Sequence, residues 1–136
     1  MSKPIPTIQK YMTTLPHTVR PDLTLVAADK IMHENSIRHL PVLNGGQLVG
    51  LLSQRDIQLI QSLKDVDVDQ VQVVEAMSQD VFEVSPSASL DEVVLTMAAK
   101  KYGSAVVTQN GKVVGIFTTV DALQALAELL QTRLAH

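Results

Sequence analysis

The chain has 136 residues, the length of about one ordinary domain, and 46% of them are hydrophobic while 18% are charged. This composition can bury a core, and the absence of cysteine excludes disulfides, thiolate metal sites and thiol catalysis. The net charge of −3 argues against a general nucleic-acid binder. No apolar run approaches the roughly 20 residues of a membrane-spanning helix, and the start lacks the pattern of a secretory signal. We therefore expect a soluble, cytoplasmic protein with no membrane insertion.

The charges are unevenly distributed along the chain. Residues 1–64 carry seven Lys and Arg against four Asp and Glu, whereas residues 65–136 carry four against ten. Most cationic side chains therefore lie in the first half, and an anionic ligand is expected to depend on that half.

An internal repeat is the strongest pattern in the sequence. A shift of 65 residues aligns Met12–Asp56 with Met77–Asp121 without a gap, and ten of the 45 aligned positions are identical. The chain thus contains two copies of one unit. Neither is expected to be stable alone, since a unit of about 50 residues buries little surface.

Each copy predicts the same order of elements. A short extended segment at Val19 or Val84 precedes a helix whose apolar residues recur at helical spacing, with Thr24 or Ser89 placed as its N-cap. Two strands joined by a tight hairpin follow, and a second helix ends the copy. The strands are expected at 39–43, 47–53, 104–108 and 112–118, and the second helices at 55–63 and about 120–134. The expected fold is α/β (α+β), with two tandem βαββα repeats.

The repeat also predicts the boundaries along the chain. We expect repeat 1 at residues 5–62, a linker at 63–72, repeat 2 at 73–128 and a C-terminal helix extension at 129–136, with short helices near 8–12 and 73–77 opening the two copies. Asp65, Asp67 and Asp69 in the linker superficially suggest a calcium loop. Such a loop needs Gly and Glu where this sequence has Gln70 and Ala76, so a solvated connector is expected.

A Gly-x-x-Ser/Thr-x-x-Asp signature closes the second strand of each hairpin. Ser53 and Thr118 stand just before a helix, where hydroxyls and free backbone N–H groups suit a phosphate. Asp56 and Asp121 follow three residues later, and a carboxylate there can accept hydrogen bonds from both hydroxyls of a ribose. The alternative is purely structural: the hydroxyl caps the helix and the Asp favours its dipole.

These features together resemble the CBS domain family in its tandem-pair form, called the Bateman module. The resemblance covers about residues 5–128 and rests on Ile37–Val42, the two glycine-containing hairpins, and the paired signatures Gly50–Asp56 and Gly115–Asp121. It implies two repeats packed with pseudo-twofold symmetry around a central cleft that often binds adenine nucleotides. The expected ligand is AMP, ADP or ATP, with no covalent cofactor.

The resemblance also implies further binding residues. Arg38 and Arg55 are at positions that often contact phosphate, and the second copy has Gly103 and Val120 instead. Surface ion pairs are the alternative for both arginines, and His39 is either a site residue or an ordinary strand residue. The positions implied for the base are Thr18, Val19, Ile37 and His39 in the first copy, and Glu83, Val84, Tyr102 and Ser104 in the second. Glu83 departs from a phosphate-friendly pattern, so we expect unequal sites dominated by the first copy. The alternative is that arginines of the first copy reach a nucleotide whose ribose is held by Asp121.

Two classes of function remain open at this stage. One is a nucleotide-binding regulatory module that acts on a separate, unidentified partner protein; the other is a ligand-free dimerisation or scaffold module. No catalytic residues and no metal site are expected, because no nucleophile–base pairing and no metal-like histidine spacing can be found.

The last helix carries a stripe of leucines at helical spacing: Leu123, Leu126, Leu130 and Leu134. This stripe predicts a homodimer, and its complete burial inside one chain is the alternative.

Overall fold

The computed structural model describes residues 4–133 and divides into two compact units. Pro16–Val81 forms the first-copy unit, while Met1–Leu15 together with Phe82–His136 forms the second-copy unit. Each unit has its own hydrophobic cluster. The mixed α/β fold expected from the repeat is confirmed within each unit.

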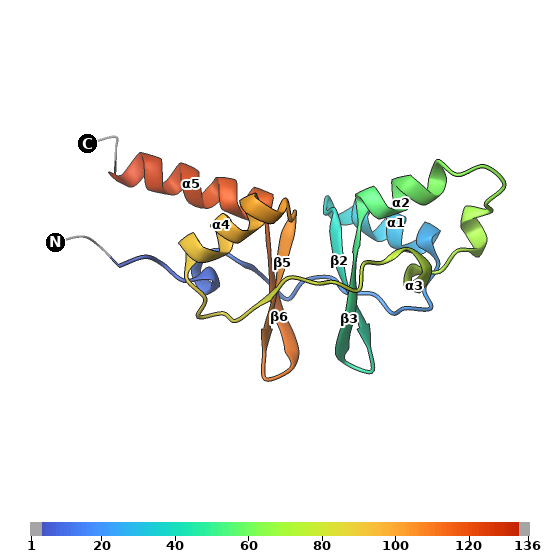
Figure 1. Ribbon diagram of the computed structural model, residues 1–136, viewed down its shortest axis with the longest axis horizontal. Coiled ribbons are helices and arrows are strands. Elements are labelled where there is room, and N and C mark those ends of the chain that lie inside the picture. The colour runs from blue at the N-terminus through green and yellow to red at the C-terminus, as the bar shows by residue number, and fades with distance from the viewer. Residues whose placement is uncertain (1–3, 134–136) are drawn as a thin grey trace. The chain divides into compact units, whose positions relative to one another are not determined.

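The first-copy unit contains a hairpin, three α-helices and a 3-10 turn (Figure 1). Its core is formed by side chains such as Leu25, Met32, Leu40, Leu52 and Ile57, all of which are essentially buried. Burial of one such side chain stabilises a fold by about 1.5–3 kcal/mol. The elements are α1 (Leu25–Asn35), β2 (His39–Asn44), β3 (Gln47–Ser53), α2 (Gln54–Gln61), the 3-10 turn η2 (Val68–Gln70) and α3 (Val73–Ala76).

The second-copy unit repeats this plan with a four-stranded sheet in the order β1-β6-β5-β4. The hairpin strands β5 and β6 are antiparallel, and β4 joins β5 in parallel. Phe117, Ala105 and Val107 lie at its core. The elements are η1 (Ile8–Lys10), β1 (Thr13–Thr14), β4 (Glu83–Val84), α4 (Leu90–Lys100), β5 (Ser104–Gln109), β6 (Lys112–Thr118) and α5 (Thr119–Arg133).

The two hairpin turns are formed as the sequence predicts. Gly45 and Gly46 have φ of 59° and 83°, and Asn110 and Gly111 have φ of 55° and 78°. Positive φ at both central residues is the requirement of the tight hairpin turn whose twist matches the strands. The turns therefore fix the register of both strand pairs.

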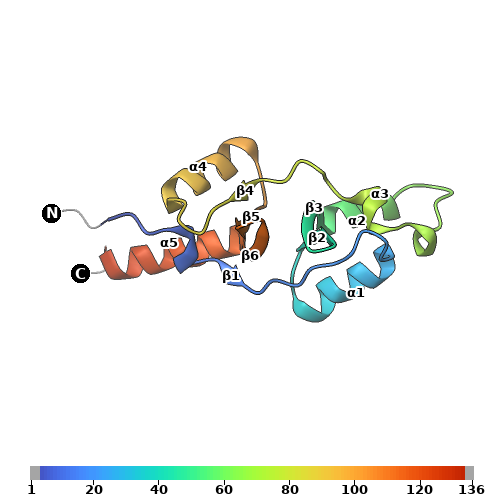
Figure 2. The ribbon, with the colours of Figure 1, turned by 90° about the horizontal axis from the view of Figure 1, so that it is seen from below.

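The segments that open each copy pack on the opposite copy. The main-chain N–H of Ile8 donates to Ala88 O at 2.9 Å, and Thr13 pairs with Ile116 in the second-copy sheet. Likewise, Ser78 exchanges two main-chain hydrogen bonds of 2.9 Å with Leu51 in the first-copy unit. Figure 2 shows the early, blue segment running beside α5. The sequence predicted these segments but not this exchange.

Two predicted details are corrected by the structure. The linker is not only a solvated connector: η2 contacts α1, and Val68 and Val71 pack against the first-copy core. Ser89 stands at the start of α4, but its hydroxyl donates to the Asp91 carboxylate and caps no backbone N–H. Thr24 does cap α1, accepting from Ala27 N at 3.2 Å.

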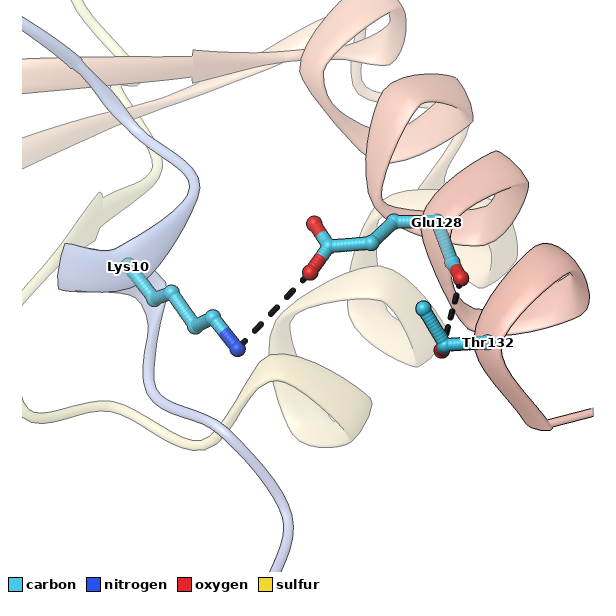
Figure 3. Close-up of polar contacts among 3 residues, drawn as sticks. All are labelled: Lys10, Glu128 and Thr132. Atoms are coloured by element: carbon cyan, nitrogen blue, oxygen red, sulfur yellow. Dashed lines mark hydrogen bonds and ion pairs between the residues drawn. The ribbon is translucent and has the colours of Figure 1, made fainter.

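Helix α5 extends beyond the length of its counterpart α2 and is tied to the N-terminal segment. The ammonium of Lys10 lies 3.9 Å from Glu128 Oε1, and the Thr132 hydroxyl donates to Glu128 O at 2.8 Å (Figure 3). Leu134, the last residue of the predicted stripe, lies outside the described residues. Within residues 4–133, no helix has the length and apolar character that crossing a membrane requires.

Candidate functional site

The backbone of the first copy brings Arg38, His39 and Ser53 together at one end of the hairpin. His39 on β2 is directly opposite Ser53 on β3, and the N–H of Gln54 donates to Arg38 O at 2.8 Å. Helix α2 begins at the next residue, so Arg55 and Asp56 fall in its first turn. The sequence-predicted polar residues of this copy therefore share one location, at the junction of β3 and α2.

The junction is held by a reciprocal capping box. Asp56 N–H donates to Ser53 Oγ at 3.1 Å, and Ser53 N–H donates to Asp56 Oδ2 at 2.8 Å. The structural alternative raised for the signature is therefore realised. The capping box nevertheless leaves part of the hydrogen-bonding capacity of these two side chains unused. Among the described residues, Asp56 Oδ1 accepts no hydrogen bond and the Ser53 hydroxyl donates none.

Positive charge at this junction is exposed and unneutralised. Arg38 and Arg55 are both exposed, and neither guanidinium forms an ion pair with a carboxylate of residues 4–133. The surface ion pairs considered as the alternative for these arginines are thus not found in the described part of the chain. Burial lowers the pKa of His39; the nearby Asp56 carboxylate opposes this shift and Arg38 reinforces it. The junction therefore carries two exposed arginines and a carboxylate with one oxygen free of hydrogen bonds from the described residues.

The second copy repeats the backbone but not the free groups. Asp121 is only 7% exposed, and its Oδ2 accepts from Thr118 N at 2.9 Å and from the Thr118 hydroxyl at 3.2 Å. Its Oδ1 accepts from the hydroxyl of Thr13 at 3.1 Å. Both oxygens of this carboxylate are therefore occupied by the protein itself.

The rest of the second-copy site carries no guanidinium. Gly103 and Val120 stand where the first copy has Arg38 and Arg55, and Thr119 N–H donates to Gly103 O at 3.1 Å, as in the first copy. Ser104, opposite Thr118 on the neighbouring strand, is 4% exposed and its hydroxyl has no hydrogen-bond partner in the described structure. This copy thus presents hydroxyls without a guanidinium at the two positions that match Arg38 and Arg55.

The positions implied for a base lie beside the hairpins rather than at the junctions. Val19 bridges Val42 in parallel, which places Thr18 and Val19 along β2, and Ile37 precedes that strand by two residues. In the second copy, Glu83 and Val84 form β4, which pairs with β5. The ring centroid of Tyr102 lies 5.3 Å from that of Phe82. Thr18 and Glu83 are exposed, while Val19 is buried.

Thr13 is the contact residue that the sequence analysis missed. Its signal was present, because Thr13 and Ser78 are an aligned hydroxyl pair next to the identical Met12 and Met77. Its role depends on the exchange of segments, which the alignment of the copies does not show. Among residues 4–133, no three His, Asp or Glu side chains gather in a way that could hold a metal ion.

Two α/β repeats, each ending its hairpin in the same hydroxyl–carboxylate junction, define a tandem-repeat module. The CBS domain family model matches residues 1–60 and 69–128, and the chain belongs to this family. It is 30% identical over 114 residues to the CBS domain-containing protein YhcV of Bacillus subtilis, covering 84% of this chain and 81% of that protein.

Solved structures share the fold over nearly the whole chain. One described as an acetoin utilization protein (AcuB) from Vibrio cholerae is similar with a TM-score of 0.86 and 30% identity, covering 98% of each chain. The CBS domain pair of protein MJ0100, in complex with 5'-methylthioadenosine and S-adenosyl-L-methionine, gives 0.83 at 24% identity, covering 92% of this chain and 98% of that one. CBSX2 in complex with AMP gives 0.80 at 23% identity, covering 90% and 97%.

Proposed function

We propose that the chain is a non-catalytic regulatory module that binds AMP, ADP or ATP at the first-copy junction and signals its occupancy to a separate partner protein. The observation that carries this proposal is the half-free Asp56 carboxylate at a junction that also carries Arg38 and Arg55, neither of which forms an ion pair within residues 4–133. Asp56 Oδ1 is available to ribose hydroxyls, and the Ser53 hydroxyl is available to donate.

The phosphate is assigned to Arg38 and Arg55. A guanidinium binds phosphate through two parallel, charge-assisted hydrogen bonds, and neither arginine has to break an ion pair within the described residues first. The base is assigned to the edge of β2 near Thr18, Val19 and Ile37. The AMP complex of CBSX2 and the two adenosine-containing ligands of MJ0100 support this ligand class as properties of proteins with the same fold.

A thermal-shift panel tests the proposal. Ligand at a hundredfold its dissociation constant stabilises a fold by about 2.7 kcal/mol, which raises the melting temperature of a domain of this size by about 4 °C or more. We expect AMP, ADP or ATP to give such a shift, with GTP as the base control and NAD and S-adenosylmethionine as adenosine-containing competitors. No shift with any of these at millimolar concentration would favour a ligand-free scaffold.

We further propose that the chain forms a homodimer through α4 and α5. Leu123, Leu126 and Leu130 on α5 are 64%, 51% and 47% exposed, so complete burial of this stripe within one chain is wrong. An apolar groove of about 850 Å³ runs beside it, lined on α4 by Leu90, Val94 and Met97 and on α5 by Ala122, Leu126 and Leu129. A self-complementary apolar face of this kind is typical of twofold association.

A further inference from the structure

The hydroxyl of Thr13 donates to the Asp121 carboxylate, which a nucleotide bound at the second-copy junction would need for its ribose. It lies 3.1 Å from Asp121 Oδ1 and 3.4 Å from Oδ2. With the two hydrogen bonds from Thr118 added, donors of the protein reach both oxygens of Asp121. An ionised carboxylate has about four acceptor positions, and three protein donors already use three of those of Asp121. A ribose diol needs two positions, so it must displace one of these donors, and Thr13 is the exposed one.

The first copy provides a built-in comparison. Ser78 holds the same backbone position beside β3 that Thr13 holds beside β6, because Ser78 pairs with Leu51 and Thr13 with Ile116. The Ser78 hydroxyl nevertheless donates to Asp80 O at 3.4 Å and makes no hydrogen bond to Asp56. Equivalent backbones therefore leave one aspartate half free and the other with three protein donors.

We propose that Thr13 closes the second-copy signature to ribose and so limits the chain to one bound nucleotide. This inference rests on the proposed function, since it concerns the same ligand class. Thr13 is itself exposed, on the short strand β1, whereas Asp121 is buried behind it. Removing its side chain therefore uncovers the carboxylate without removing a buried core side chain.

The closing contact is a charge-assisted hydrogen bond, the stronger class of protein hydrogen bond. A ribose hydroxyl offers the same kind of donor, so replacing the Thr13 hydroxyl with it brings little gain in binding free energy. The ligand also loses its freedom of motion when it binds. No guanidinium at Gly103 or Val120 adds phosphate affinity to offset this cost. The hydroxyl of Thr13 alone thus disfavours nucleotide binding at the second-copy junction.

Calorimetry with adenosine tests this inference, because adenosine probes the ribose contact without a phosphate. The first-copy carboxylate is disabled by Asp56→Asn, and Thr13→Ala or Thr13→Ser is added to that chain. We expect Asp56→Asn alone and its Thr13→Ser derivative to bind weakly or not at all. The Thr13→Ala derivative should gain about tenfold or more in affinity, and Asp121→Asn should abolish this gain.

Two outcomes would overturn the inference. One is adenosine binding by the Asp56→Asn chain that is lost with Asp121→Asn, since the second signature would then already be open. The other is no gain in a folded Thr13→Ala derivative; if that derivative does not fold, Thr13→Val, which keeps the bulk and removes the hydroxyl, replaces it. The proposed function fails separately, if the unmodified chain binds no AMP, ADP or ATP.

Discussion

Asp56 and Asp121 stand at the same place in two copies of one fold, yet the donors around them differ. The hydroxyl and N–H of Thr118 and the hydroxyl of Thr13 all reach Asp121, whereas among residues 4–133 the Asp56 carboxylate receives only the N–H of Ser53. A carboxylate with a free oxygen can bind a ligand, whereas one that already accepts from three protein donors acts first as a structural group. The difference between the copies thus lies in partners and not in the signature itself.

His39 makes the stability of the fold depend on pH. Burial lowers its pKa in the folded chain below the ordinary value of 6.5, so the unfolded chain binds more protons as the pH falls through that range. Stability rises with pH wherever the unfolded state holds more protons, so the fold is most stable well above pH 6.5 and loses stability as the pH falls through 6.5 toward the lowered pKa of His39.

Urea unfolding at pH 7.5 and pH 5.5, about one unit either side of the ordinary imidazole pKa, measures this effect. We expect the free energy of unfolding to fall less between these two pH values in His39→Gln than in the unmodified chain. His17→Gln is the matched control, because His17 is exposed. Equal pH dependence in the unmodified and His39→Gln chains would show that His39 is not the group responsible.

The sequence predicted the residues of the first-copy junction because they depend on local order. Ser53, Arg55 and Asp56 follow one another at the start of a helix, and the hairpin register brings His39 opposite Ser53. The contact of Thr13 with Asp121 spans 108 residues. No local pattern specifies it, since it depends on which copy the N-terminal segment packs against.

At the scale of elements, close approach of the exchanged segments explains two identical glycines. A Cβ on Gly50 would lie 2.5 Å from the Sδ of Met77 and 2.9 Å from Ser78 O, and one on Gly115 would lie 2.6 Å from the Sδ of Met12 and 3.0 Å from Thr13 O. The methionine can move, but the carbonyl oxygen belongs to the paired backbone. The repeated Met and Gly therefore form one packing contact in each unit.

We expect Gly50→Ala and Gly115→Ala each to destabilise the fold by about 1–3 kcal/mol, the usual cost of overpacking a close contact. Chemical denaturation measures this loss. Gly45→Ala is the comparison for a glycine with open space around it, where only the positive φ opposes a side chain. Unchanged stability in both overpacked variants would mean that the segments do not approach the strands as described.

The hairpin strands and their turns could be predicted almost to the residue, since short apolar runs and the turn pairs Gly45-Gly46 and Asn110-Gly111 determine them locally. The linker could not: its aspartates indicate a solvated segment, while Val68 and Val71 pack on the first-copy core. Isolated valines among charges carry too weak a pattern to reveal such packing. Likewise, Ser89 stands at a position typical of an N-cap, but its hydroxyl donates to the Asp91 carboxylate and accepts from no backbone N–H in the described structure.

At the scale of the whole molecule, the exposed α5 stripe predicts association. A chain of 14.8 kDa should scatter light as a particle of about twice that mass at micromolar concentration. Leu126→Glu should shift it to the monomer, because a charge in the apolar groove would be desolvated in the dimer. Leu15→Glu, at a residue that is 90% exposed and outside the groove, is the control. A monomeric unmodified chain would contradict the dimer.

The most direct test of the central claim is calorimetry of AMP binding to the unmodified chain, Asp56→Asn and Asp121→Asn. Asparagine keeps an oxygen that can accept from the capping N–H, so each helix start is preserved while the charged acceptor for ribose is lost. We predict that Asp56→Asn weakens AMP binding by about ten- to a hundredfold, the worth of one charge-assisted hydrogen bond, and that Asp121→Asn changes it much less. Loss of binding in Asp121→Asn with full binding in Asp56→Asn would contradict the assignment of the nucleotide to the first copy.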